Sequence, residues 1–163
     1  MVGITSREDS ATSSFAEESG WAAAFVGTLD NLAELDDGSA SQASFPAAIL
    51  LSLFRRRGAQ STQLLRGTFA AVVTDGRRLW CFRDHLGFEP LFYTERDGAL
   101  FVASEAKQVV AGADINREPD VEFLEGIFFG EPTEEWRCAY TGIRRLPRRT
   151  MLTCQEGRME LTT

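Results

Sequence analysis

The most apolar segments of the chain do not alternate between apolar and polar side chains. They are Trp21–Val26, Thr68–Val73 and Leu79–Phe82. A strand that is apolar on both sides must be covered on both faces of its sheet. Because Asp75-Gly76, a strong hairpin signal, joins two of these segments, we expect antiparallel neighbours. The pattern predicts an antiparallel sheet with a second sheet on one face and helices on the other. We expect the core to include Phe69, Ala71, Val73, Leu79, Cys81 and Leu91.

Turn signals divide the rest of the chain into further strands. Asp97-Gly98 and Glu156-Gly157 predict two more hairpins. We interpret Gly27 as the turn that ends the first apolar strand. Gly87 can adopt a positive φ, which predicts a tight turn, and Pro90 suits the first residue of the strand that follows it.

Two segments have the spacing of a helix with one apolar side. In the helix that begins at Pro46, this side consists of Ile49, Leu50, Leu53 and Phe54. In the helix between Pro119-Asp120 and Gly130, it consists of Val121, Leu124, Ile127 and Phe128. We expect both apolar sides to face the core. Shorter helices are expected over Asp30–Leu35 and from about Ser104 to Ala111-Gly112.

The N-terminal region lacks any such periodicity. Met1–Ile4 is apolar enough for a short buried strand. Residues 5–20 are rich in Ser, Thr and acidic side chains and have almost no apolar pattern. We therefore expect a loop or a disordered segment over residues 5–20.

Composition predicts one globular domain over residues 1–163. A formal charge of −7 argues against a nucleic-acid partner, which would favour concentrated positive charge. No apolar segment is long enough to cross a bilayer, and no secretory signal is present, so we expect no membrane partner. Three cysteines and one histidine are too few for a Cys/His zinc site. We expect no bound metal, and reduced thiols in a cytoplasmic protein.

Few side chains are candidates for chemistry. Cys81 lies in an apolar strand, where a buried thiol usually only packs. His85 is interpreted as a turn residue rather than a catalytic base, because it has no partnered nucleophile. Arg83 and Asp84 are charges at the end of a strand, and we expect them to pair with each other or with neighbouring groups.

The segments Arg83–Tyr93 and Phe101–Lys107 together resemble the pattern R-D-x-x-G-x-x-P-L-Y/F-Y … F-A-S-E-x-K of asparagine synthetases. That pattern lies in their N-terminal class II glutamine amidotransferase domain. Ala24–Leu35, Leu65–Ala70 and Gly142–Pro147 are similar to three further motifs of the family, in the same order. The resemblance implies the α+β fold of N-terminal-nucleophile hydrolases, a four-layer αββα sandwich with antiparallel sheets. It also implies a framework role for the matching motif residues, which are Arg83, Asp84, Gly87, Pro90, Ser104, Glu105 and Lys107.

The resemblance breaks down at the residues that carry the family's chemistry. There, a first-residue cysteine attacks the glutamine amide, and an Asn-Gly pair binds the oxyanion. In this chain Val2 stands at the nucleophile position and Val26 replaces the Asn. Gly27 is kept, while Thr28 stands where the family has Glu, so these two residues are a remnant of the substrate site. The implied domain is degenerate and has no catalytic residue. It is similar in this to the N-terminal domains of β-lactam synthetases and lasso-peptide cyclases.

The resemblance implies a glutaminase-inactive domain of an asparagine-synthetase-like, ATP-dependent amide-forming enzyme. No Ser-Gly-Gly-x-Asp-Ser pyrophosphate loop is present, so we expect the synthetase domain to be absent from residues 1–163. ATP and magnesium are then expected only in a separate synthetase domain, and no cofactor in this chain.

Residues 123–140 are dense in aromatic side chains, of which Phe129 and Trp136 have no evident role in the predicted core. We expect this region to contact either a synthetase-domain protein or a second copy of the chain. The alternative is that a long loop folds these rings back onto the sandwich. A stand-alone interaction module on the same fold is the alternative interpretation. A working glutaminase is a third, and it requires a different start that exposes a cysteine.

Overall fold

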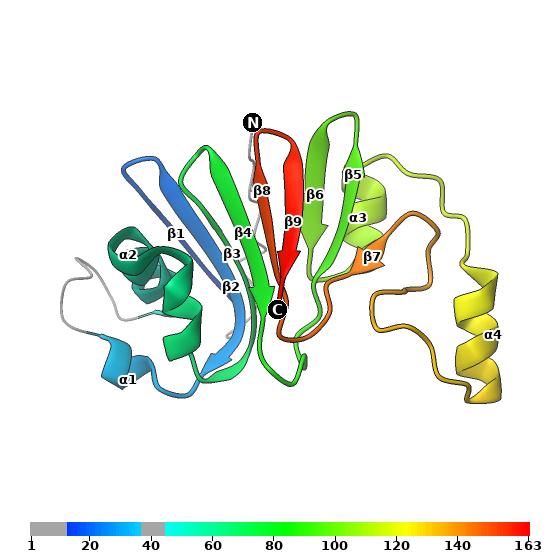
Figure 1. The fold of residues 1–163 in the computed structure, drawn as a ribbon, viewed down its shortest axis with the longest axis horizontal. Coiled ribbons are helices and arrows are strands. Elements are labelled where there is room, and N and C mark those ends of the chain that lie inside the picture. Colours follow the sequence, from blue (N-terminus) through cyan, green and yellow to red (C-terminus); the bar gives the residue numbers. More distant parts are fainter. Residues whose placement is uncertain (1–12, 37–44) are drawn as a thin grey trace.

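The computed structural model describes residues 13–36 and 45–163, so the strand predicted at Met1–Ile4 lies outside the described residues. Two antiparallel sheets form the centre of the molecule (Figure 1). The first sheet has six strands in the order β1-β2-β3-β4-β8-β9, and the second has three in the order β6-β5-β7. The strands of the first sheet are β1 (Ser13–Glu18), β2 (Trp21–Leu29), β3 (Gly67–Thr74), β4 (Arg78–Arg83), β8 (Met151–Gln155) and β9 (Arg158–Thr162). Those of the second are β5 (Phe92–Arg96), β6 (Ala99–Ala103) and β7 (Arg144–Arg145).

Helices cover the outer face of each sheet. Figure 1 shows α2 beside the first sheet and α3 beside the second, while α4 stands apart at the end of the molecule. The helices are α1 (Leu32–Leu35), α2 (Pro46–Arg57), the 3₁₀ helix Gly58–Leu64, α3 (Ala106–Gly112) and α4 (Val121–Phe129). The layers are therefore helix, sheet, sheet and helix, which confirms the predicted αββα sandwich.

Three separate apolar clusters fill the three spaces between these four layers. The first joins α2 to the first sheet and includes Ile49, Leu50, Phe54, Phe69, Val73 and Phe82. The second lies between the sheets and includes Ala70, Leu79, Cys81, Leu91, Leu146 and Leu152. The third joins the second sheet to α3 and includes Val109, Val110 and Ile143. Neighbouring residues of β3 and β4 alternate between the first two clusters, which is why these strands are apolar on both sides. All six predicted core residues are buried.

The predicted loop over residues 5–20 is wrong where the structure describes it. Ser13–Glu18 forms β1, an edge strand paired with β2 from Ser13↔Val26 to Glu18↔Trp21. Ser19 and Gly20 turn the hairpin with φ values of 52° and 82°. Backbone pairing with β2 stabilises this strand, and apolar side chains contribute little, so a hydrophobic pattern does not reveal it. Residues 5–12 lie outside the described part of the chain.

The apolar side of α4 was also predicted wrongly. Its four residues are exposed: Val121 by 58%, Leu124 by 42%, Ile127 by 62% and Phe128 by 83%. Gly126 is the one buried residue of this helix. The side of α4 that we expected to face the core therefore faces outward.

Candidate functional site

Gly27 does not end β2, as the sequence suggested, but lies within it. It is paired with Phe69 of β3 at a φ of 112°. A Cβ atom on Gly27 would lie 2.1 Å from the Thr68 carbonyl oxygen and 3.0 Å from Cγ of Glu89. Only glycine fits between these groups. At position 27, β2, β3 and the loop that contains Glu89 are therefore in close contact.

The residues on either side of Gly27 offer little for chemistry. Val26 is half-buried and packs against the apolar cluster between the sheets. Thr28 is exposed and lies opposite Thr68. Val2, which we expected at the nucleophile position, lies outside the described residues.

The loop between β4 and β5 is organised by the carboxylate of Asp84, which is only 3% exposed. Its Oδ1 accepts hydrogen bonds from the backbone N–H groups of Leu86 (2.8 Å) and Gly87 (2.6 Å). Its Oδ2 accepts from the N–H groups of Phe69 (3.2 Å), Phe88 (3.1 Å) and Glu89 (3.4 Å). One side chain thus fixes the whole turn and attaches it to β3.

Arg83 binds the same loop from the other side. Its guanidinium donates to the carbonyl oxygens of Glu89 (2.5 Å), Leu146 (2.6 Å) and Gly87. Burial, together with the nearby Arg145, lowers the pKa of Arg83 from its ordinary value. We expected Arg83 and Asp84 to pair with each other or with neighbours, and their hydrogen bonds go to backbone groups. Both side chains are parts of the framework.

Three segments that are far apart in the sequence therefore converge on this turn. Asp84 binds the Leu65–Ala70 segment, Arg83 binds Gly142–Pro147, and Glu89 approaches Gly27. Gly87, at a φ of 70°, allows the turn to close against Arg148. Sequence motifs suggested each segment separately, but nothing in the sequence showed that Glu89 or the carbonyl of Leu146 would join them.

The remaining motif residues lie elsewhere. Pro90 lies two residues before β5 rather than opening it. Ser104 and Glu105 precede α3, and Glu105 forms an ion pair of 2.6 Å with Lys107 at the start of that helix. Ser104, Glu105 and Lys107 thus lie at the start of the helix beside the second sheet.

The three cysteines are free thiols. Cys81 is fully buried opposite Val72 and Leu152, and burial raises its pKa well above the ordinary value. Burial also raises the pKa of Cys138, whose Sγ lies 3.4 Å from the carbonyl oxygen of Ile143. Cys154 is half-buried on β8. The thiolate is the reactive form of cysteine, so Cys81 and Cys138 are poor nucleophiles. In the described part of the chain, no three His, Cys, Asp or Glu side chains group as metal ligands would.

Residues 9–163 match a family model described as a glutamine amidotransferase domain. The chain belongs to this family. Over 133 residues it is 30% identical to a putative glutamine-hydrolysing asparagine synthetase of Mycobacterium tuberculosis, which covers 75% of this chain and 20% of that protein. Over 66 residues it is 39% identical to asparagine synthetase 3 of Bacillus subtilis, covering 39% of this chain and 11% of that protein. The chain thus spans a fifth or less of the length of these relatives.

Solved structures of class II amidotransferases share the fold. A glutamine phosphoribosylpyrophosphate amidotransferase of B. subtilis, solved with ADP and GMP, aligns with a TM-score of 0.62 at 22% identity, over 91% of this chain and 30% of that one. A structure described as the allosteric regulatory enzyme of purine biosynthesis aligns with a TM-score of 0.58 at 20% identity, over 90% of this chain and 29% of that one. Together with the family match and the asparagine synthetase relatives, this fold identifies the chain as an N-terminal class II glutamine amidotransferase domain of asparagine-synthetase-like proteins. None of the described helices is long and apolar enough to span a membrane.

Proposed function

We propose that this amidotransferase domain does not hydrolyse glutamine. Instead, it serves as a structural, partner-binding part of an asparagine-synthetase-like, ATP-dependent amide-forming enzyme. The observation that carries the proposal is Val26 beside Gly27. Where the family motif has an amide donor for the oxyanion, this chain has an apolar side chain packed between the sheets. Loss of one such donor costs about two to three orders of magnitude in rate.

The distribution of thiols supports the same conclusion. Cys81 is buried in β4, Cys138 is buried after α4, and Cys154 lies on β8, whereas the oxyanion position lies on β2. Glutamine hydrolysis by this family needs a thiolate beside that position. The framework around Arg83 and Asp84 is nevertheless complete, with each side chain satisfied by several backbone groups. The chain has kept the groups that hold the fold and changed those that perform the reaction.

In an enzyme of this kind, ATP and magnesium bind a separate synthetase domain, and the amine comes from the substrate rather than from glutamine. The contribution of the present domain is then architectural. The exposed apolar side of α4 favours the alternative of a stand-alone interaction module as well, because both functions need a docking surface. The two differ in whether a synthetase polypeptide is the partner.

Incubation with glutamine is expected to release no glutamate above a no-protein blank. The variants Val2→Cys and Val26→Asn are each expected to remain inactive, because each restores only one of the missing parts. A purified glutamine-hydrolysing asparagine synthetase serves as the positive control for the assay. Reproducible turnover by the wild-type chain would show that the domain is an active glutaminase and that the proposal is wrong.

A further inference from the structure

Helix α4 presents a continuous apolar side to solvent. Val121, Leu124 and Phe128 lie at positions i, i+3 and i+7, which fall on one side of a helix. Ile127 borders this row. Phe129, 71% exposed, packs edge-on against Phe128 with ring centroids 5.2 Å apart. We call these five residues the α4 face. Its spacing matches the anchors of helices that bind in grooves of other proteins.

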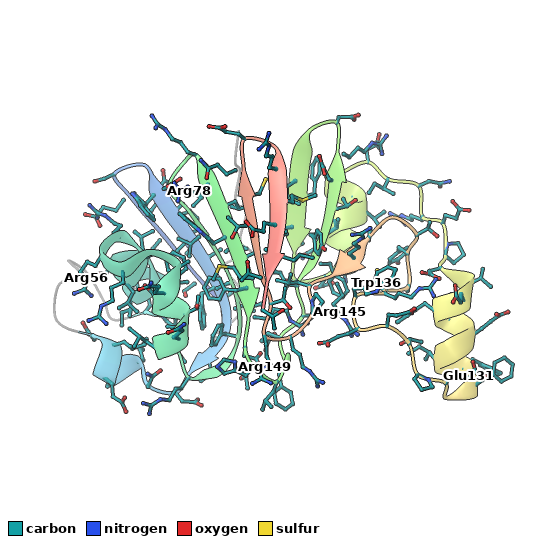
Figure 2. All side chains as sticks on the ribbon, viewed as in Figure 1. Arg56, Arg78, Glu131, Trp136, Arg145 and Arg149 are labelled. Atoms are coloured by element: carbon teal, nitrogen blue, oxygen red, sulfur yellow. The ribbon has the colours of Figure 1, made fainter. Side chains whose placement is uncertain are left out.

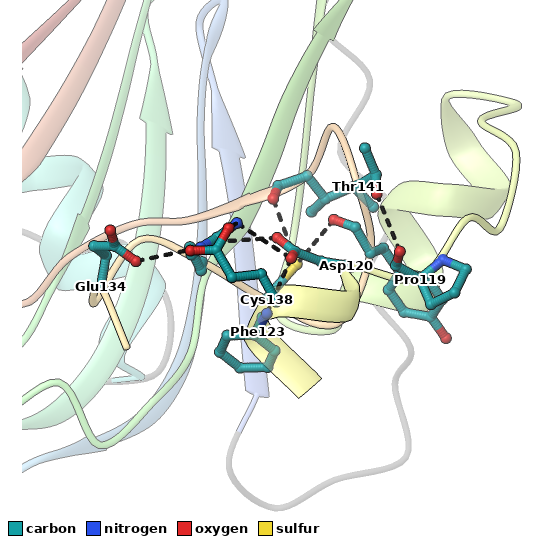
Figure 3. A network of polar contacts seen from close by, with 10 residues as sticks. Pro119, Asp120, Phe123, Glu134, Cys138 and Thr141 are labelled. Carbon is teal, nitrogen blue, oxygen red and sulfur yellow. Dashed lines mark hydrogen bonds and ion pairs between the residues drawn. The ribbon is translucent and has the colours of Figure 1, made fainter. Parts of the chain in front are cut away.

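A network of polar contacts holds this helix in place although it stands away from the sandwich (Figure 3). Asp120 caps the helix by accepting a hydrogen bond of 3.0 Å from the N–H of Phe123. Arg137, whose side chain is 15% exposed, forms ion pairs with Asp120 (3.2 Å), Glu122 (2.7 Å) and Glu134 (3.6 Å). The hydrogen bond from Arg137 lowers the pKa of Glu122, so this pair stays charged below neutral pH.

The segment that follows α4 packs against the side opposite the α4 face. A Cβ atom on Gly126 would lie 2.6 Å from Cγ2 of Thr133, so helix and segment are in close contact there. Trp136, between α4 and β7 (Figure 2), lies 5.7 Å from the guanidinium carbons of both Arg137 and Arg144. Its carbonyl accepts a hydrogen bond of 2.7 Å from the N–H of Arg145. Trp136 thus makes intramolecular contacts, which favours the folded-back alternative for this ring, while the α4 face points outward.

The surroundings of the α4 face are acidic. Every charged residue from Glu118 to Glu135 is an aspartate or a glutamate. On α4 itself, Glu122 and Glu125 are both exposed, and Glu131 follows at its C-terminal end (Figure 2). A complementary partner must therefore combine an apolar groove with a basic rim.

We propose that the α4 face docks into an apolar, Arg/Lys-rimmed groove on the synthetase part of the amide-forming enzyme. The M. tuberculosis relative is about five times as long as the segment that aligns with this chain, since that segment covers 20% of it. The part of such an enzyme outside this domain is large enough to contain the groove. A symmetric pair of α4 faces would bring like charges together, and an anionic membrane would repel them.

The test measures binding of the chain to the purified synthetase part of the enzyme, produced as a separate polypeptide. This part is the one that aligns with the remainder of the M. tuberculosis relative. Leu124→Ser combined with Phe128→Ser is expected to weaken binding about 30-fold or more, because such anchors are typical hot spots. The matched control, Met159→Ser combined with Leu161→Ser, removes exposed apolar side chains from β9 and is expected to bind like wild type. Glu125→Lys is expected to slow association, and Glu160→Lys to leave it unchanged. Melting temperatures should be the same for all four variants, because every changed residue is exposed.

Several outcomes would overturn the proposal. One is equal binding by the α4 variant and the control, and another is no binding by the wild type. Light scattering that shows a dimer lost in the α4 variant would identify a second copy as the partner instead. Co-sedimentation with phosphatidylglycerol vesicles, lost in the same variant, would identify a membrane. The inference rests on the proposed function only for the identity of the partner. If the chain hydrolyses glutamine, the proposed function is wrong but the binding result still stands. If the chain does not bind the synthetase part, the docking proposal is wrong but the glutamine result still stands.

Discussion

Val73→Asp is expected to abolish soluble, folded protein. Val73 is 0% exposed near the C-terminal end of β3, opposite Ala23 of β2 and Trp80 of β4. It belongs to the cluster that joins α2 to the first sheet, where neighbouring side chains are apolar. An unpaired carboxylate buried there costs several kcal/mol. That is comparable with the total stability of a domain, roughly 5–15 kcal/mol.

Soluble yield and a thermal melt of any purified protein measure this effect. Val121→Asp is the matched control, because it makes the same substitution at a residue that is 58% exposed. The control is expected to express and melt like wild type. A cooperative melt for Val73→Asp within a few degrees of wild type would show that β3 is not covered on this face, contrary to the layered architecture.

The layers could be predicted from the sequence because a strand that is buried on both faces has apolar residues at consecutive positions. β3 and β4 are apolar at consecutive positions, and the hairpin at Asp75-Gly76 joins them as expected. The same reasoning failed at β1, whose stability comes from backbone pairing with β2. It also failed at α4, because helical periodicity shows that one side is apolar but not what covers it. The residues of the α4 face are spaced like those of a core-facing helix side, but they are exposed to solvent.

The site could be predicted only in pieces. The motifs around Gly27, Phe69, Asp84 and Leu146 were each recognisable, yet their meeting depends on hydrogen bonds to backbone groups. Every residue type has a backbone C=O, and all but proline have an N–H. The sequence therefore does not show which backbone groups bind Arg83 and Asp84. The sequence also suggested a turn at Gly27. The actual reason for glycine there is the close approach of Thr68, which only the three-dimensional structure shows.

Asp84→Asn is expected to lower the free energy of unfolding by about 3 kcal/mol or more. The substitution preserves the size of the side chain but turns one acceptor oxygen into an NH₂ group. That group would face backbone N–H donors, among them those of Leu86, Gly87 and Phe69. At 3% exposure, water cannot replace the lost acceptor. At least two backbone donors then lose this acceptor, and the β4–β5 loop is held less tightly.

Denaturant unfolding of wild type, Asp84→Asn, Arg83→Met and the double variant measures both the cost and the coupling between the two side chains. Because both hold the same loop, the double variant should cost less than the sum of the single ones. His85→Asn, next to them but exposed, is the control and should stay within about 0.5 kcal/mol of wild type. If Asp84→Asn also stays within that range, the loop does not depend on the carboxylate. If the two costs simply add, Arg83 and Asp84 support separate structures, and the convergence of three segments on this turn is not cooperative.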